Sequence, residues 1–140
     1  MRLVIDTNVL VAALRSRHGA SNALLVRVLG GEAVWLCSVP LFVEYQEVLM
    51  RAEFVLETGH TRPALATFLS DIAAAIEPVE LNFLWRPQLA DPKDEMALET
   101  AANGRADAIV TFNTKDFAPA AARFGLDLLT PAETLRRIET

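Results

Sequence analysis

The feature of this chain that most constrains its fold is a regular alternation of short apolar runs with longer amphipathic segments. The short runs are rich in β-branched residues and are bounded by polar residues or glycines, which predicts buried strands. Strands are predicted at residues 2–6, 33–37, 76–79, 107–111 and 126–129. Helices are predicted at residues 9–14, 21–29, 39–50, 54–59, 63–75, 92–103 and 132–138, with a loop at 83–90. This alternation predicts an α/β fold, a three-layer α/β/α sandwich with a central parallel sheet of about five strands.

The length and composition indicate one folded unit. A chain of 140 residues can bury a core without disulfides, so we expect a single domain over residues 1–140. Polar residues interrupt its apolar stretches well before the ~20 residues that a membrane-spanning helix needs. The first strand begins at Arg2, which leaves no room for a signal peptide, and Cys37 is the only cysteine. We therefore expect a cytoplasmic protein in a reducing environment, with no membrane segment.

Acidic residues stand close to the ends of the predicted strands. They are Asp6, Glu44, Asp94 and Asp116. Strand ends in an open parallel sheet are where such folds build their sites. Carboxylates gathered there repel each other, which favours a hard divalent cation such as Mg²⁺ or Mn²⁺ to hold them together. Such an ion can lower the pKa of a bound water and orient a phosphate, so the pattern indicates a metal-dependent hydrolase.

Each acid also has a structural interpretation. Asp6 and Asp94 stand near predicted helix starts, where negative charge is favourable. Glu44 fits a solvated helix face, and Asp116 lies in an Asn-Thr-Lys-Asp segment of ordinary turn composition. Asp91 is interpreted as a helix cap rather than a ligand, because a proline follows it. The four acids together, rather than any one of them, favour the metal site.

Three segments of the chain resemble the PIN-domain family of nucleases. They read DTNVLVAAL from Asp6, DPKDEMALETA from Asp91 and IVTFNTKDF from Ile109. The resemblance extends over essentially the whole chain and is closest to the toxin branch of bacterial and archaeal toxin–antitoxin pairs. It implies a parallel sheet of order 3-2-1-4-5 and an endoribonuclease that uses Mg²⁺ or Mn²⁺ to hydrolyse RNA. It also implies a homodimer and a small antitoxin protein as a partner.

The resemblance implies roles for individual residues. The acids that match the metal site of the family are Asp6, Glu44, Asp94 and Asp116. The residues that would support them are Thr7, Asn8, Ser38, Thr111 and Asn113. Some relatives carry aspartate where this chain has Asn113, and an amide at that place supplies an oxygen ligand without a charge.

The charge distribution permits an RNA-cutting enzyme without requiring one. A net charge of −5 argues against a protein that coats nucleic acid, because phosphate contacts need clustered basic residues. Candidate contacts to RNA phosphates are Arg15, Arg17 and Lys115, with solvated loop charge as the alternative interpretation.

Other functions remain open at this point. One is an aspartate-based phosphatase, although that chemistry usually needs an acid two residues after Asp6, where Asn8 stands. Another is a phospho-receiver domain, and the last is a catalytically weak PIN-like module that acts through protein contacts.

Overall fold

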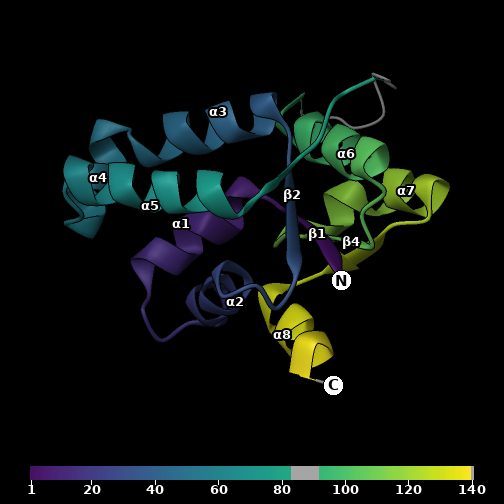
Figure 1. Cartoon of the computed structure of the whole chain (residues 1–140), viewed down its shortest axis with the longest axis horizontal. Helices are drawn as coiled ribbons and strands as arrows, with labels where there is room; N and C mark the ends of the chain where they lie inside the picture. Colours follow the sequence, from purple (N-terminus) through teal and green to yellow (C-terminus); the bar gives the residue numbers. More distant parts are fainter. Residues whose placement is uncertain (83–91, 140) are drawn as a thin grey trace.

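A five-stranded, all-parallel sheet in the order β3-β2-β1-β4-β5 lies at the centre of the molecule (Figure 1). The structure is a computed structural model that describes residues 1–82 and 92–139. The strands are β1 (Arg2–Ile5), β2 (Val34–Cys37), β3 (Glu77–Pro78), β4 (Ala108–Val110) and β5 (Asp127–Leu129). The predicted α/β class and the strand order implied by the resemblance are confirmed.

Helices cover both faces of the sheet. The described helices are α1 (Thr7–Arg15), α2 (Ala20–Leu29), α3 (Val39–Leu49), α4 (Ala52–Thr58), α5 (Arg62–Ala75), α6 (Pro92–Gly104), α7 (Thr114–Phe124) and α8 (Pro131–Glu139). In Figure 1, α6 and α7 lie to one side of the strands, whereas α1, α2 and α5 lie to the other. α6 packs against β1, β2 and β4, so its first turn reaches the same end of the sheet as the carboxyl ends of those strands.

β1 is the central strand and is covered on both faces. Leu3, Val4 and Ile5 have no exposed surface. Val4 pairs with Leu36 of β2 on one side and with Ile109 of β4 on the other. A parallel strand buried in this way requires a continuous apolar run rather than an alternating one. The chain leaves the sheet directly after Ile5, so the first polar residue after β1 is held at the carboxyl edge of the sheet.

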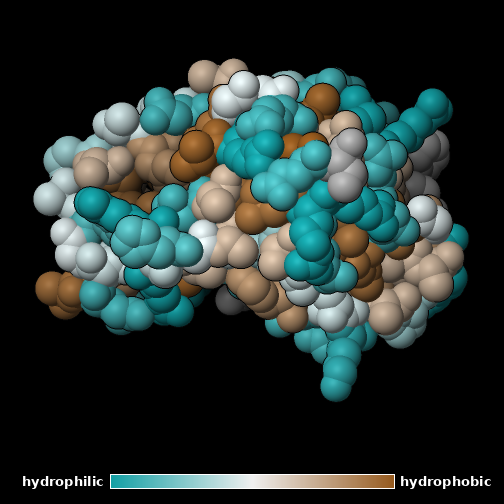
Figure 2. All heavy atoms as spheres, turned by 90° about the horizontal axis from the view of Figure 1, so that it is seen from below, coloured by the Kyte–Doolittle hydropathy of each residue, from teal (hydrophilic) through white to brown (hydrophobic). Residues whose placement is uncertain are grey.

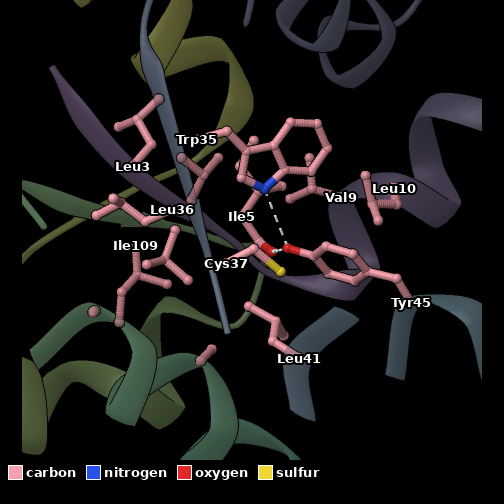
Figure 3. Packing of buried hydrophobic residues seen from close by; sticks show 14 of the residues in the cluster. Leu3, Ile5, Val9, Leu10, Trp35, Leu36, Cys37, Leu41, Tyr45 and Ile109 are labelled. Atoms are coloured by element: carbon pink, nitrogen blue, oxygen red, sulfur yellow. Dashed lines mark hydrogen bonds between the residues drawn. The ribbon is translucent and has the colours of Figure 1, made fainter. Parts of the chain in front are cut away.

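A buried aromatic pair fixes α3 against this end of β1 (Figure 3). The Tyr45 hydroxyl donates a hydrogen bond to the Ile5 carbonyl, and the Trp35 indole N–H lies 3.4 Å from the Tyr45 oxygen. Burial raises the pKa of the Tyr45 hydroxyl well above its ordinary value, so the hydroxyl remains a donor. Burial also raises the pKa of the neighbouring Cys37 thiol to about 12, which makes it an unreactive core residue.

The structure departs from the sequence prediction after β4. A turn was expected around Asp116, but residues Thr114–Phe124 form α7. The helix buries Phe117 on the sheet side, accommodates Pro119 and ends at Gly125, which has a positive φ of 66°. β3 is confined to residues 77–78 rather than 76–79. The predicted loop at 83–90 and the cap at Asp91 lie outside the described residues.

The face shown in Figure 2 mixes hydrophilic and hydrophobic side chains. The large exposed hydrophobic side chains are Met1, Val26, Val34, Val39, Val43, Leu56 and Phe112. Within residues 1–82 and 92–139, every helix is too short or too polar to cross a membrane.

A candidate metal centre at the carboxyl edge of the sheet

A hollow of about 250 Å³ lies where β1 ends. It is lined by Asp6, Thr7, Asn8, Val11, Glu44, Val48, Asp94 and Asn113. These residues come from the end of β1, from α1, α3 and α6, and from the segment between β4 and α7. The parallel topology thus gathers residues from distant parts of the sequence at one edge of the sheet, as the position of the acids predicted.

Asp6 is held by two hydrogen bonds. Its Oδ1 accepts from the Thr7 amide at 2.8 Å, and its Oδ2 accepts from the Thr111 hydroxyl at 2.7 Å. Asp6 is also the residue that caps α1, where the helix N-terminus favours negative charge. The Asp6 carboxylate therefore both caps α1 and lines the candidate metal site.

Glu44 lies in the second turn of α3 and points into the hollow. Its Oε2 accepts a hydrogen bond from the Thr7 hydroxyl at 2.5 Å. The exposed fractions of Asp6, Glu44 and Asp94 are 7%, 8% and 6%, so all three carboxylates are buried. The interpretation of Glu44 as part of a solvated helix face is therefore wrong.

A polar contact at the start of α3 holds that helix against α6. The Ser38 and Thr100 hydroxyl oxygens lie 2.7 Å apart. Thr100 donates its single hydroxyl hydrogen to the Met96 carbonyl, so Ser38 is the donor to Thr100. Ser38 does not line the hollow. It acts at a distance, because it fixes the helix that carries Glu44 relative to the helix that carries Asp94.

The far side of the hollow is organised by Thr111. Thr111 is fully buried, and its hydroxyl accepts a hydrogen bond from the backbone N–H of Asn113 at 3.0 Å. The same hydroxyl lies 3.5 Å from the side-chain nitrogen of Asn8. The Asn8 Oδ1 is buried and has no hydrogen-bond partner among the described residues. An amide oxygen that is desolvated without a partner is costly in an apoprotein, and a bound cation would satisfy it.

The remaining candidates from the sequence lie outside the hollow. Asp116 is exposed in the first turn of α7 and is not among the lining residues. Arg15 is in an ion pair with Glu57, with 2.8 Å between Nε and Oε1. Arg17 and Lys115 are exposed.

The residues of the hollow fit a hard divalent cation by their chemistry. They offer three carboxylates and the Asn8 amide oxygen, with Asn113 beside them. In the described part of the chain, no three acidic, histidine or cysteine side chains converge closely enough to hold a metal ion as they stand. Asp6 and Glu44 each accept a hydrogen bond from a threonine hydroxyl, from Thr111 and Thr7 respectively.

Sequence reasoning missed the apolar part of the hollow. Val11 and Val48 line it, and each stands one helical turn after a polar lining residue, Thr7 and Glu44 respectively. The i, i+4 spacing places such pairs on one helix face, so this signal was available in the sequence. Glu95 and Glu99 are further buried acids on α6 that the sequence analysis did not single out, and they do not line the hollow.

The fold and the hollow define a class of α/β protein with an acidic pocket at the carboxyl edge of a parallel sheet. The sequence pattern of the PIN domain matches residues 2–115, and the chain therefore belongs to the PIN-domain family. Proteins with this domain are generally nucleases and generally use divalent metal ions. A comparison with curated proteins gives no match.

Proposed function

We propose that this protein is an endoribonuclease that hydrolyses RNA phosphodiester bonds with the help of Mg²⁺ or Mn²⁺. The observation that carries the proposal is the presence of three buried carboxylates, from the end of β1, from α3 and from α6, in one hollow that Asn8 and Asn113 also line. Three carboxylates kept from water in a small space are costly unless a cation compensates their charge. Family membership favours a nuclease over the phosphatase and the phospho-receiver.

In this proposal Asp6, Glu44 and Asp94 hold the metal ion, with amide oxygens of Asn8 and Asn113 completing the oxygen donors. When bound, the ion supplies Lewis-acid stabilisation of the phosphate and lowers the pKa of a water molecule. Asp116 has a lesser role in the proposal, because it is exposed at the start of α7 and does not line the hollow.

The protein's own hydroxyls orient the acids. Thr7 donates to Glu44, and Thr111 donates to Asp6, so each of these carboxylates has one oxygen fixed by a neighbouring side chain. The Thr7 hydroxyl is committed to this bond and is not placed to act as a nucleophile. Water is therefore the nucleophile in the proposed reaction.

We extend the proposal to a biological role as the toxin of a toxin–antitoxin pair. The resemblance of the three sequence segments supports this role, together with a homodimer, a cytoplasmic location and neutralisation by a small antitoxin. Expression of the chain alone is expected to arrest bacterial growth, and an Asp6→Asn chain is expected not to. Growth that is unaffected by an active enzyme would remove the toxin role and leave the nuclease in place.

The experiment that tests the activity is incubation of purified protein with total RNA in Mn²⁺, in Mg²⁺ and in EDTA. We expect discrete fragments with either metal and none in EDTA. Asp6→Asn and Asp94→Asn should each slow cleavage by about 100-fold or more, because loss of even an outer contact to a metal ligand costs about 10- to 100-fold.

The matched control is Asp71→Asn. Asp71 is an exposed acid on α5 and lies away from the hollow, so its substitution makes the same chemical change without touching the site. Thermal unfolding of all variants shows whether each remains folded. Cleavage by Asp6→Asn at the rate of Asp71→Asn would contradict the proposal, as would wild-type cleavage that continues in EDTA.

A further inference from the structure

Asn113 occupies a helix-capping position without acting as a cap. It stands directly before α7, and its side chain makes no capping hydrogen bond to that helix. The capping residues of α1, α3 and α5 are Asp6, Ser38 and Thr61, and each of these side chains accepts a hydrogen bond from a backbone N–H. Asparagine is among the best capping residues, so the Asn113 side chain forgoes a contact that its residue type favours.

The backbone at Asn113 accounts for the missing cap. The three capping residues are extended, with ψ between 148° and 164°, whereas Asn113 has a φ of −96° and a ψ of 47°. Its N–H donates to the Thr111 hydroxyl at 3.0 Å, and its carbonyl accepts from the backbone N–H of Asp116 at 3.1 Å. The backbone is thus held on both sides of the side chain, and the residue lines the acidic hollow.

The hollow contains few side-chain donors. Its three carboxylates only accept hydrogen bonds when ionised, and its two valines offer none. The Thr7 hydroxyl already donates to Glu44, and the Asn8 nitrogen lies 3.5 Å from the Thr111 hydroxyl. The Asn113 side chain makes no hydrogen bond within residues 1–82 and 92–139. Among the lining residues that the structure describes, Asn113 therefore carries the side-chain N–H donors that remain unused.

A phosphate group needs such donors. Its non-bridging oxygens are negatively charged, and hydrogen bonds to an ionised acceptor are stronger than neutral ones. Donors that are held in place where charge develops in the transition state contribute strongly to catalysis. An amide can direct its oxygen towards a cation and its nitrogen towards an anion, whereas a carboxylate offers acceptors only. An aspartate in place of Asn113 would repel the phosphate.

We propose that Asn113 is a catalytic residue that donates a hydrogen bond from Nδ2 to a non-bridging oxygen of the scissile phosphate. The proposal rests on the endoribonuclease function proposed above and adds a role that an oxygen ligand cannot fill. Nδ2 keeps its protons throughout the reaction. Asn8 differs, because its nitrogen lies near Thr111 and its buried Oδ1 has no partner among the described residues. Asn8 therefore presents an oxygen to the hollow, and Asn113 presents N–H groups.

The decisive variant is Asn113→Asp, which keeps an oxygen ligand and removes both N–H donors. Its affinity for Mn²⁺, measured by calorimetry without RNA, should equal or exceed that of the wild type, because a carboxylate is a favoured ligand of hard cations. Its cleavage of total RNA in saturating Mn²⁺ should fall by about 100-fold, as for loss of one donor to a developing oxyanion. Aspartate is also a good capping residue, so α7 should remain folded, and thermal unfolding checks this.

A second variant and a control complete the test. Replacing a non-bridging oxygen of the cleaved phosphate with sulfur, a poor acceptor, should slow the wild type. Asn113→Ala should be slowed less by the same replacement, since its hydrogen bond is already absent. The matched control is Asn82→Asp, which makes the same chemical change at an exposed residue that does not line the hollow. It should bind Mn²⁺ and cleave RNA as the wild type does.

The outcomes separate this inference from the function on which it rests. Wild-type protein that cleaves no RNA in Mn²⁺ or Mg²⁺ overturns both. Wild-type cleavage that Asn113→Asp matches overturns the donor role alone and leaves Asn113 as an oxygen ligand. A Mn²⁺ affinity that falls together with the cleavage rate of Asn113→Asp also overturns the donor role, because the loss then comes from the metal. So does a sulfur effect of equal size in the wild type and in Asn113→Ala.

Discussion

At the scale of single residues, Thr111 organises the site more than any acid does. Its hydroxyl donates a hydrogen bond to the Asp6 carboxylate at 2.7 Å and accepts one from the backbone N–H of Asn113 at 3.0 Å. The side-chain nitrogen of Asn8 lies 3.5 Å away. The side chain is fully buried, so water cannot replace any of these partners. One hydroxyl thus sets the position of a carboxylate and of the two asparagines that line the hollow.

We predict that Thr111→Val, which keeps the shape of the side chain but removes the hydroxyl, lowers the free energy of unfolding by about 1–3 kcal/mol. RNA cleavage should fall by about 10- to 100-fold, as for other residues that orient metal ligands. Thr111→Ser, which keeps the hydroxyl, should retain most of the stability and most of the cleavage rate. Urea unfolding and the initial cleavage rate measure the two effects.

The control for this prediction is Thr67→Val on α5. Thr67 is exposed and, among the residues that the structure describes, its hydroxyl bonds only to the Pro63 carbonyl one turn earlier, so its loss should change stability and cleavage little. Equal behaviour of the two valine variants would show that the Thr111 hydroxyl does not position the site.

At the scale of elements, the close packing and the left-handed backbone at the end of α6 fall on two neighbouring residues, Gly104 and Arg105. A Cβ atom on Gly104 would lie 2.9 Å from a methyl group of Val79 and 3.3 Å from a methyl group of Leu36, so a larger residue there would force Val79 to shift. The positive φ of 54° falls on the next residue, Arg105. The Gly104 carbonyl also accepts a hydrogen bond from the Arg2 side chain at 2.9 Å, which connects this turn to β1.

We predict opposite effects for two substitutions at this turn. Arg105→Gly should raise the free energy of unfolding by up to about 1 kcal/mol. A left-handed conformation costs a residue with a Cβ roughly 1–2 kcal/mol, and glycine removes this cost. Part of the gain is lost, because glycine also raises the conformational entropy of the unfolded chain. Gly104→Ala should lower it, because Val79 must move. Denaturant unfolding of both variants tests the assignment, and a stabilising Gly104→Ala would contradict it.

The same scale shows what the sequence could and could not predict. β1 and α1 were predicted because a β-branched run is followed directly by residues that can cap a helix. α7 was missed because Pro119 and the polar segment before it are typical of a turn, and only the packing of Phe117 favours the helix.

The candidate site was predictable in its members but not in its contacts. The positions of Asp6 and Asp94 follow from strand ends and helix starts, which are local features. The bond from Thr7 to Glu44 depends on how α1 packs against α3, and the pairing of Arg15 with Glu57 spans 42 positions. Neither can be obtained from local sequence, which also explains why Arg15 was proposed as an RNA contact.

At the scale of the whole molecule, three carboxylates from distant parts of the chain lie buried in one hollow. Their mutual repulsion is reduced when an ion binds, and an ion that binds only the folded state stabilises it by mass action. In the proposed function, the site acids would therefore connect the stability of the domain to the metal concentration.

We predict that Mn²⁺ at 100 times its Kd raises the free energy of unfolding by about 2.7 kcal/mol. Asp94→Asn should gain much less from Mn²⁺ than the wild type does. Asp71→Asn should gain as much as the wild type. Thermal unfolding in EDTA and in a Mn²⁺ series measures the effect, and an unchanged Tm across the series would contradict it.

The central position of β1 also has a consequence for synthesis of the protein on the ribosome. β1 is synthesised about a hundred residues before its neighbour β4, since Leu3 pairs with Ala108. Asp6 and Glu44 therefore leave the ribosome long before Asp94 and Thr111 exist. Proteins emerge at only about 5–20 residues per second, so the hollow stays incomplete for seconds while the nascent chain remains close to its own message. The proposed RNA-cutting site is thus assembled only after the segment that carries α6 and β4 has been synthesised.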